Sequence, residues 1–227
     1  MEDLRSRLEG VLERIERAAR SAGRDPGDVR LIAVSKSFPP EIVREARSLG
    51  LRDFGENRAQ ELRFKYENLR DLDITWHFIG RIQSNKIKIF VPIVEYVHSL
   101  WREKEALEMD KRAGLLGKRL KVFVEVNVSG EESKAGVEPE KLREFLRICS
   151  GMKNLEIIGL MTMAPLVEDP EKVRWVFRKL RDIRDELSVE FPNLKELSMG
   201  MSNDFEVAIQ EGATFIRVGT AVFGPRT

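Results

Sequence analysis

The sequence predicts one (β/α)₈ barrel of the TIM-barrel class, preceded by an extra amino-terminal helix. Strand-length apolar runs alternate with segments of helical period along the chain, which favours parallel strands joined by crossover helices. The strand-like runs number eight, and no G-x-G-x-x-G motif follows an early one, so a closed barrel is favoured over an open doubly wound sheet. A chain of 227 residues suffices for one barrel and is too short for a second large domain, so we expect residues 1–227 to form a single domain.

The elements follow in order from the first helix. Apolar residues recur at helical spacing from Leu4 to Ala18 with charged residues between them, which predicts an amphipathic helix to about Gly23. A Pro-Gly turn at residues 25–27 ends it. Strands are then expected at residues 29–34, 52–55, 74–79, 94–100, 120–128, 155–163, 194–199 and 214–218. Helices are expected between them at residues 40–49, 59–69, 83–90, 103–113, 139–150, 170–190 and 204–210.

Charge and composition exclude several classes of function. The 39 Lys and Arg residues nearly balance 38 Asp and Glu residues, and a net charge of +1 gives no field that would attract nucleic acid or an anionic membrane. The amino-terminal residues lack the apolar stretch of a signal peptide and no apolar run could span a bilayer, which predicts a cytoplasmic protein. Cys149 is the only cysteine, and the two histidines, His77 and His98, form no close cluster with it, so we expect neither a disulfide nor a metal site.

Polar residues stand at the ends of the predicted strands. In barrels of this class the chemistry lies on the loops that follow the carboxyl ends of the strands. The residues at those ends are Ser35 and Lys36, Glu56 and Asn57, His77, His98 and Ser99, Glu125 and Asn127, Met161 and Thr162, residues 198–202, and residues 217–220. Polar groups inside apolar strand runs need partners in a packed interior, so the pattern predicts a polar site at one mouth of the barrel.

Lys36 is the sharpest candidate because it ends the apolar run of residues 31–34. Desolvation there would lower the pKa of its ammonium group and free the amine to attack a carbonyl, which is how Schiff-base lysines arise. The alternative is a lysine that extends from a strand end into water.

The loops after the seventh and eighth strands point to a phosphate site. Residues 198–204 form a glycine-containing turn before a helix, with Ser202, Asn203 or Asp204 as the candidate N-cap, and residues 217–220 follow the last strand. Barrel enzymes often bind phosphate between these two loops, at the N–H groups of a helix N-terminus. A phosphate site opposite a strand-end lysine suits pyridoxal 5′-phosphate (PLP), with a Schiff-base aldolase for sugar phosphates as the competing interpretation.

Six segments together resemble the YggS/PROSC-type pyridoxal phosphate homeostasis proteins. They are A-V-S-K at residues 33–36, F-G-E-N at 54–57, W-H-F-I-G at 76–80, G-L-M-T-M at 159–163, L-S-M-G-M-S at 197–202 and R-V-G-T at 217–220. They span almost the whole chain in order, which makes the resemblance specific. It implies a barrel like the N-terminal domain of alanine racemase, with PLP held on Lys36 as a Schiff base.

The resemblance also assigns the remaining site residues. It implies that Asn57 lies near the cofactor ring and that Arg217 contacts either the ring or the phosphate. Two strand-end residues, His77 and Met161, are further candidates for cofactor binding, with an acid–base role and a structural role both open for His77. The residues expected to line the phosphate are Ser198, Met199, Ser202, Gly219 and Thr220.

A carrier is favoured over an enzyme. Racemisation on PLP needs a second acid–base group, and the two tyrosines, Tyr66 and Tyr96, stand away from the predicted strand ends. The family resemblance implies binding, buffering and delivery of PLP, with apo forms of PLP-dependent enzymes as candidate acceptors and a monomer sufficient for the task. An amino-acid racemase remains the alternative, and a partner-docking protein in which the cofactor is incidental is a third.

Overall fold

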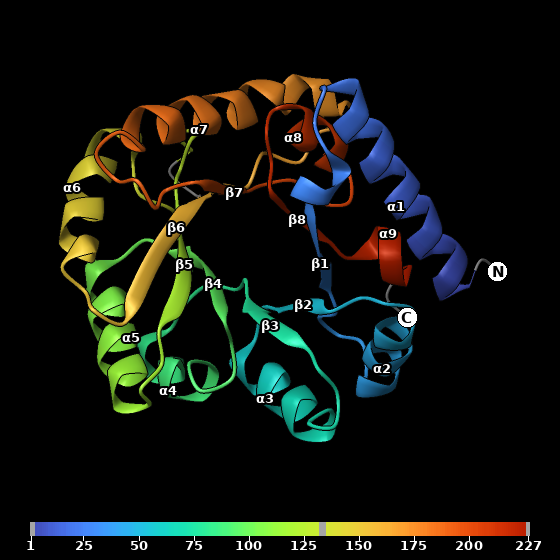
Figure 1. Ribbon diagram of the computed structural model, residues 1–227, viewed down its shortest axis with the longest axis horizontal. Helices are drawn as coiled ribbons and strands as arrows, with labels where there is room; N and C mark the ends of the chain where they lie inside the picture. The colour runs from blue at the N-terminus through green and yellow to red at the C-terminus, as the bar shows by residue number, and fades with distance from the viewer. Residues whose placement is uncertain (1–2, 132–134, 226–227) are drawn as a thin grey trace.

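The computed structural model describes residues 3–131 and 135–225, so the first two residues of the amino-terminal segment lie outside it. Eight parallel strands close into a barrel in sequence order, as the sequence predicts (Figure 1). The strands are β1 (Arg30–Val34), β2 (Asp53–Glu56), β3 (Thr75–Phe78), β4 (Tyr96–Leu100), β5 (Leu120–Glu125), β6 (Leu155–Met161), β7 (Glu196–Ser198) and β8 (Phe215–Val218). Each predicted strand is therefore present.

The helices form a ring outside the strands (Figure 1). They are α1 (Leu4–Ser21), α2 (Pro40–Ser48), α3 (Ala59–Asn68), α4 (Ile87–Phe90), α5 (Glu103–Leu115), α6 (Pro139–Ser150), α7 (Arg174–Leu187), α8 (Phe205–Gln210) and α9 (Thr220–Phe223). Single 3₁₀ turns lie at Pro26–Asp28, Ser84–Lys86 and Pro170–Val173. The last two explain why the expected helices at 83–90 and 170–190 begin later as α-helix, and the short α9 is an element that the sequence pattern did not indicate.

Several strands are shorter than their apolar runs. The run 120–128 ends as a strand at Glu125, because Val126 leaves the ladder and forms an isolated bridge with Val137. The run 155–163 ends as a strand at Met161. Val126 and Val128 stay buried past the last ladder bond of β5, whereas Met163 is exposed past the end of β6, so apolarity alone overestimates strand length.

The closure of the barrel brings the predicted site segments to one edge. In β1, Ala33 pairs with Phe54 of β2 on one side and with Val218 of β8 on the other. Because the three strands are parallel, the residues that follow them emerge at the same mouth. Lys36, Asn57 and Gly219 therefore lie on adjacent loops.

The apolar core has two parts. The larger one fills the space between the strands and the helices, where both bury an apolar face. The smaller one lies inside the barrel and consists of Ile32, Tyr96, Phe123, Met161 and Phe215. Successive strand residues face alternate sides, so the neighbours of these residues belong to the outer core.

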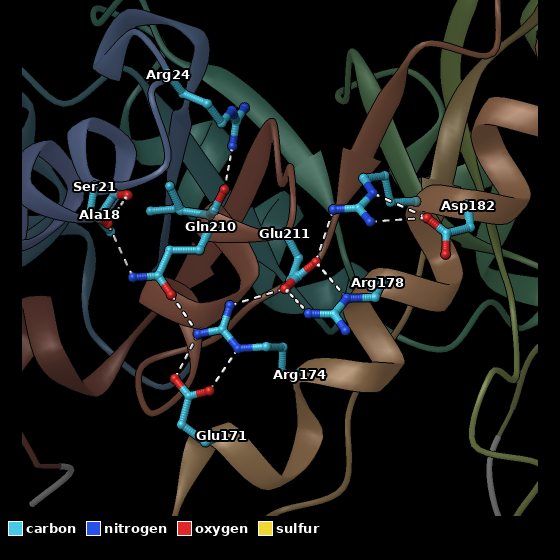
Figure 2. Close-up of polar contacts among 11 residues, drawn as sticks. Ala18, Ser21, Arg24, Glu171, Arg174, Arg178, Asp182, Gln210 and Glu211 are labelled. Carbon is cyan, nitrogen blue, oxygen red and sulfur yellow. Dashed lines mark hydrogen bonds and ion pairs between the residues drawn. The ribbon is translucent and has the colours of Figure 1, made fainter.

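Polar contacts hold α8 against α1 and α7. Glu211, which directly follows α8 and is almost fully buried, accepts hydrogen bonds from Arg174, Arg178 and Arg181 of α7 (Figure 2). On the other side, Arg14 of α1 forms an ion pair with Glu206 of α8. These contacts fix α8 behind the loops that follow β7 and β8.

Candidate functional site

A cavity of about 390 Å³ lies at the carboxyl ends of the strands. The loops after β1, β2, β3, β6, β7 and β8 all contribute to its wall. Its polar lining includes Lys36, Asn57, Ser202, Asp204, Arg217 and Thr220. The mouth that the sequence predicts as polar is therefore hollow and contains charged groups.

Lys36 lies on a turn after β1 that α3 holds in place. Ser37 has a φ of 69°, in the left-handed region that a non-glycine residue adopts only when its surroundings hold it there. The Ser37 N–H donates to Glu61 Oε1 over 2.5 Å, and Lys65 Nζ donates to the Ser35 carbonyl over 2.7 Å. The backbone on both sides of Lys36 is thus fixed.

A buried ion pair lies behind this turn. Lys65 Nζ is 2.5 Å from Glu56 Oε1, and both side chains are almost fully buried. Ser35 Oγ donates to the same carboxylate oxygen over 2.7 Å, whereas Glu56 Oε2 has no hydrogen-bond partner among the described residues. Burial raises the pKa of Glu56, and the nearby Lys65 opposes that shift. The ammonium group of Lys65 therefore compensates the buried negative charge of Glu56.

The loops after β7 and β8 meet at Ser202. Its Oγ accepts hydrogen bonds from the N–H groups of Gly219, at 3.2 Å, and Ala221, at 3.4 Å. Thr220 lies between these two donors and lines the cavity. A hydroxyl and adjacent backbone N–H groups make a donor set that suits a phosphate group.

Gly200 allows the β7 loop to fold tightly against α8. Its φ is 93°, and a Cβ at this position would lie 2.7 Å from the Ala208 Cβ. Asp204 Oδ1 accepts from the Met201 N–H over 2.6 Å and closes the loop. Of the three predicted N-cap residues, Asp204 therefore occupies the N-cap position of α8, although its carboxylate bonds back into the loop.

Arg217 is the second cation in the cavity wall, although its side chain is 95% buried, with 5% exposed. It donates to Ser198 Oγ over 2.7 Å and to the Thr162 carbonyl over 3.0 Å. Burial lowers the pKa of Arg217 to about 10, against the opposing effect of Glu125 and Asp204. The guanidinium thus remains charged at neutral pH.

The structure brings most, and not all, of the predicted site residues together. Lys36, Asn57, Ser202, Arg217, Gly219 and Thr220 line the cavity. The four that do not line it are His77, Met161, Ser198 and Met199. Met161 belongs to the apolar cluster inside the barrel and Met199 to the outer core, while His77 and Ser198 are fully buried. Ser198 and Met199 are consecutive and face opposite sides of the sheet.

Two groups of residues at or behind the site are not among those expected from the sequence to bind the cofactor, although Met163 ends the G-L-M-T-M segment. The loop after β6 adds an apolar rim that includes Met163, Pro165 and Leu166. Leu166 is 84% exposed, and the apolar run that continues past the strand was the available signal. The sequence does not indicate the Glu56–Lys65 ion pair, because Glu56 ends a strand and Lys65 lies in the following helix, and no local pattern connects them.

Residues 3–131 and 135–225 contain no group of three or more His, Cys, Asp or Glu side chains placed to hold a metal ion. Across the same residues, no helix is both long and apolar enough to cross a bilayer. Cys149 is buried, and burial raises the pKa of its thiol to about 12.

Comparison with known proteins connects this geometry to a family. The family model described as the N-terminal domain of alanine racemase matches residues 7–227. The pyridoxal phosphate homeostasis protein of Aquifex aeolicus is 52% identical over 97% of both chains, and that of Pseudomonas aeruginosa is 44% identical over 100% of this chain and 97% of its own. PipY of Synechococcus elongatus, solved with PLP bound, is 41% identical, with a TM-score of 0.83 and coverage of 93% of this chain and 100% of its own.

Proposed function

The chain belongs to the pyridoxal phosphate homeostasis proteins of the alanine racemase N-terminal domain family, and we propose that it binds PLP in the carboxyl-end cavity. The single observation that supports this most strongly is the placement of Lys36, Ser202 and Arg217 in one cavity of about 390 Å³. The PLP-bound relative, PipY, supports the same proposal.

The donor set of the cavity fits the chemistry of this cofactor. A phosphate dianion only accepts hydrogen bonds. Ser202 would supply a hydroxyl donor, and the Gly219 N–H, which donates to Ser202 Oγ in this structure, would be a second donor when it turns from Ser202 to the phosphate. Lys36 supplies a primary amine on a fixed turn in the same cavity. When bound, PLP would supply an electrophilic aldehyde and an electron-withdrawing ring.

Lys36 is the group that we assign to the aldehyde. Its primary amine would hold PLP through the aldehyde, and the fixed turn after β1 keeps that amine in the cavity. Asn57 and Arg217 would orient the ring and the phosphate from the flanking strands. Arg217 has N–H donors only, so it cannot hold a proton on a ring nitrogen as a carboxylate would.

We further propose a carrier rather than an enzyme. Among the described residues that line the cavity, the titratable side chains are Lys36, Asp204 and Arg217. Tyr66 lies in α3, and the Tyr96 hydroxyl accepts from Arg30 and Lys121 at the opposite mouth. A second acid–base group of the kind that racemisation needs is therefore not supplied by either tyrosine. Racemisation of L-amino acids above the rate of free PLP would overturn this part of the proposal.

The proposed carrier role extends to partners and location. We propose a single-domain cytoplasmic monomer that passes PLP to apo forms of PLP-dependent enzymes, without contact with nucleic acid or membranes. The near balance of 39 basic and 38 acidic residues supports the last part. Reactivation of an apo-enzyme by the loaded protein, at a rate above that given by the same concentration of free PLP, is the expected result.

Absorption spectroscopy tests the binding proposal directly. Wild-type protein titrated with PLP should develop a stoichiometric band near the edge of the visible range, because the C=N bond extends the conjugated ring system. Lys36→Ala should lack this band, while Lys88→Ala, which removes an exposed lysine of α4, should keep it. A colourless wild type, or a band that survives in Lys36→Ala, would contradict the proposal.

A further inference from the structure

A hydrogen-bonded chain of side chains crosses the inside of the barrel and ends at the cavity. Arg217 donates to Ser198 Oγ at 2.7 Å, and Ser198 Oγ lies 2.8 Å from His98 Nδ1. His98 Nε2 lies 3.0 Å from His77 Nδ1, and His77 Nε2 lies 2.9 Å from Asp53 Oδ1. The chain thus joins β8, β7, β4, β3 and β2.

The two ends of this chain fix the direction of every hydrogen bond in it. Asp53 offers carboxylate oxygens, so His77 must donate from Nε2 and, when neutral, accept at Nδ1. His98 must then donate from Nε2 and accept at Nδ1, which leaves the Ser198 hydroxyl as its donor. Arg217 can only donate, so Ser198 Oγ accepts the hydrogen bond from Arg217 on a lone pair. With both imidazoles neutral and the carboxylate ionised, this is the one arrangement in which each contact has one donor and one acceptor.

The surroundings favour neutral imidazoles. His77, His98 and Ser198 are fully buried, and burial lowers the pKa of His77 and, more strongly, that of His98. The charged groups that face His77 are Asp53 of β2, Arg30 of β1 and Glu95, next to β4; the charged group that faces His98 is Arg217 of β8. Tyr96 stacks on the His77 ring at 4.5 Å and closes the other side.

We propose that His77 and His98 are positioning residues that, together with Asp53, hold Ser198 Oγ as an acceptor for Arg217 and so fix the guanidinium at the cavity wall. The other contact of Arg217, the Thr162 carbonyl, belongs to the backbone and needs no such control. A residue near the far mouth of the barrel thereby influences the cation at the ligand cavity. The identity of the ligand rests on the proposed function, whereas the hydrogen-bonded chain itself does not.

Imidazole ¹⁵N spectra of the untagged protein without PLP test the chain. The sequence contains two histidines, so the spectrum contains two spin systems. Both should show the neutral Nε2–H tautomer at neutral pH and take up a proton only below about pH 6.5, the ordinary midpoint of a histidine. An Nδ1–H tautomer at either residue, or ordinary titration of both, would overturn the proposal.

Asp53→Asn separates a directed chain from simple packing. The asparagine amide can present either an oxygen or an N–H to His77, so it permits both directions of the chain. We expect the two histidines to change together to a mixture of tautomers, although His98 lies one residue further along the chain and does not touch position 53. A change confined to His77 would overturn the coupling, because independent histidines would respond separately.

The effect on the cavity is measured by PLP dissociation. Ser198→Ala removes the acceptor of Arg217, and we expect PLP to bind about tenfold more weakly, the effect of one charge-assisted hydrogen bond. Tyr96→Phe is the matched control, because it keeps the ring on His77 and removes a hydroxyl outside the chain; less than about a twofold change is expected. Equal effects of the two variants would overturn the positioning role.

The outcomes distinguish this inference from the proposed function. If the wild type binds no PLP, the proposed function fails, while the ¹⁵N spectra still decide whether the directed chain exists. If PLP binds and the histidines titrate normally, the inference fails and the proposed function stands.

Discussion

Two buried polar networks support neighbouring parts of the wall of the same cavity, because β1 and β8 are adjacent, and they differ in how their charges are balanced. Behind Lys36, the carboxylate of Glu56 and the ammonium of Lys65 form an ion pair with almost no exposed side-chain surface. Beneath Arg217, two histidines occupy the interior of the chain that begins at Asp53. The first network fixes a backbone turn, and the second fixes a side chain.

The difference shows what each kind of network can control. A buried ion pair is held by attraction between opposite charges, and its desolvation cost makes each partner dependent on the other. A chain of neutral groups contains no such attraction in its interior. Its stability therefore depends on each hydrogen bond having one donor and one acceptor. The lysine side of the cavity should therefore be sensitive to loss of charge, and the arginine side to protonation.

The largest expected effect is the loss of one charge from the ion pair. Lys65→Met leaves the Glu56 carboxylate buried without its cation, and we expect the free energy of unfolding to fall by about 3–5 kcal/mol. Denaturant unfolding at neutral pH measures this change. Lys88→Met is the control, because it removes an exposed lysine and should change stability by less than about 0.5 kcal/mol.

The double variant Glu56→Leu/Lys65→Met sharpens that result. With both charges removed, no uncompensated buried charge remains at positions 56 and 65, although the Ser35 hydroxyl loses its acceptor and Glu61 loses its contact with Lys65, so part of the stability lost in Lys65→Met should return. A double variant as unstable as Lys65→Met would show that the ion pair is not what couples these two positions.

The next effect is a pH dependence that separates the two networks. Because burial lowers the pKa of His77 and His98, the unfolded chain binds their protons first. Stability should fall as the pH drops below about 6.5, by up to about 1.4 kcal/mol per pH unit for each histidine. Burial raises the pKa of Glu56, so that carboxyl takes up its proton first in the folded state and works in the opposite direction.

Unfolding measured between about pH 8 and pH 5 checks this sign. His98→Gln should show a shallower decline than the wild type, because one buried neutral histidine is gone. A decline of unchanged slope would mean that His98 is not held neutral in the folded protein.

A smaller effect is expected at a cavity residue outside both networks. Ser202→Ala removes the hydroxyl that accepts from Gly219 and Ala221, and we expect PLP binding to weaken by about 1–1.5 kcal/mol. Fluorescence or absorbance titration measures the affinity. Ser84→Ala changes an exposed serine and should leave the affinity unchanged. An effect as large as that of Ser202→Ala would contradict the assignment of Ser202 to the phosphate-binding site.

The smallest effect is expected for a half-exposed arginine on the outside of the barrel. Arg178 is about half exposed and is one of three arginines on Glu211 (Figure 2). Arg178→Ala should cost less than about 1 kcal/mol of unfolding free energy, since two arginines remain. A loss comparable with that of Lys65→Met would contradict the distinction between buried and exposed charge.

The fold was largely predictable from the sequence because alternation between strand and helix is local. The eight strands and the order of their closure follow from periodicity and the handedness of crossovers. Strand ends were less predictable: Val126 and Val128 continue the apolar run of β5 but lie outside its ladder. Apolar loop residues that pack on a barrel look the same in sequence as strand residues.

The site was predictable where position along a strand decides function and not where tertiary pairing does. Lys36, Asn57 and Ser202 line the cavity because they directly follow strand ends or lie in the predicted loop. The sequence predicts Ser198 as a phosphate-binding residue, whereas in the structure its hydroxyl is buried and accepts a hydrogen bond from Arg217. The direction of the histidine chain depends on contacts between residues up to 100 positions apart, such as His98 and Ser198, which no local pattern contains.

Reductive trapping followed by peptide mapping tests the central claim most directly. Borohydride converts the C=N bond between a lysine and PLP into a stable secondary amine, which mass spectrometry locates. We predict one adduct per chain, on the peptide that contains Lys36, and none at this position in Lys36→Arg. A principal adduct on any other lysine, or no adduct on protein saturated with PLP, would contradict the claim that Lys36 holds the cofactor.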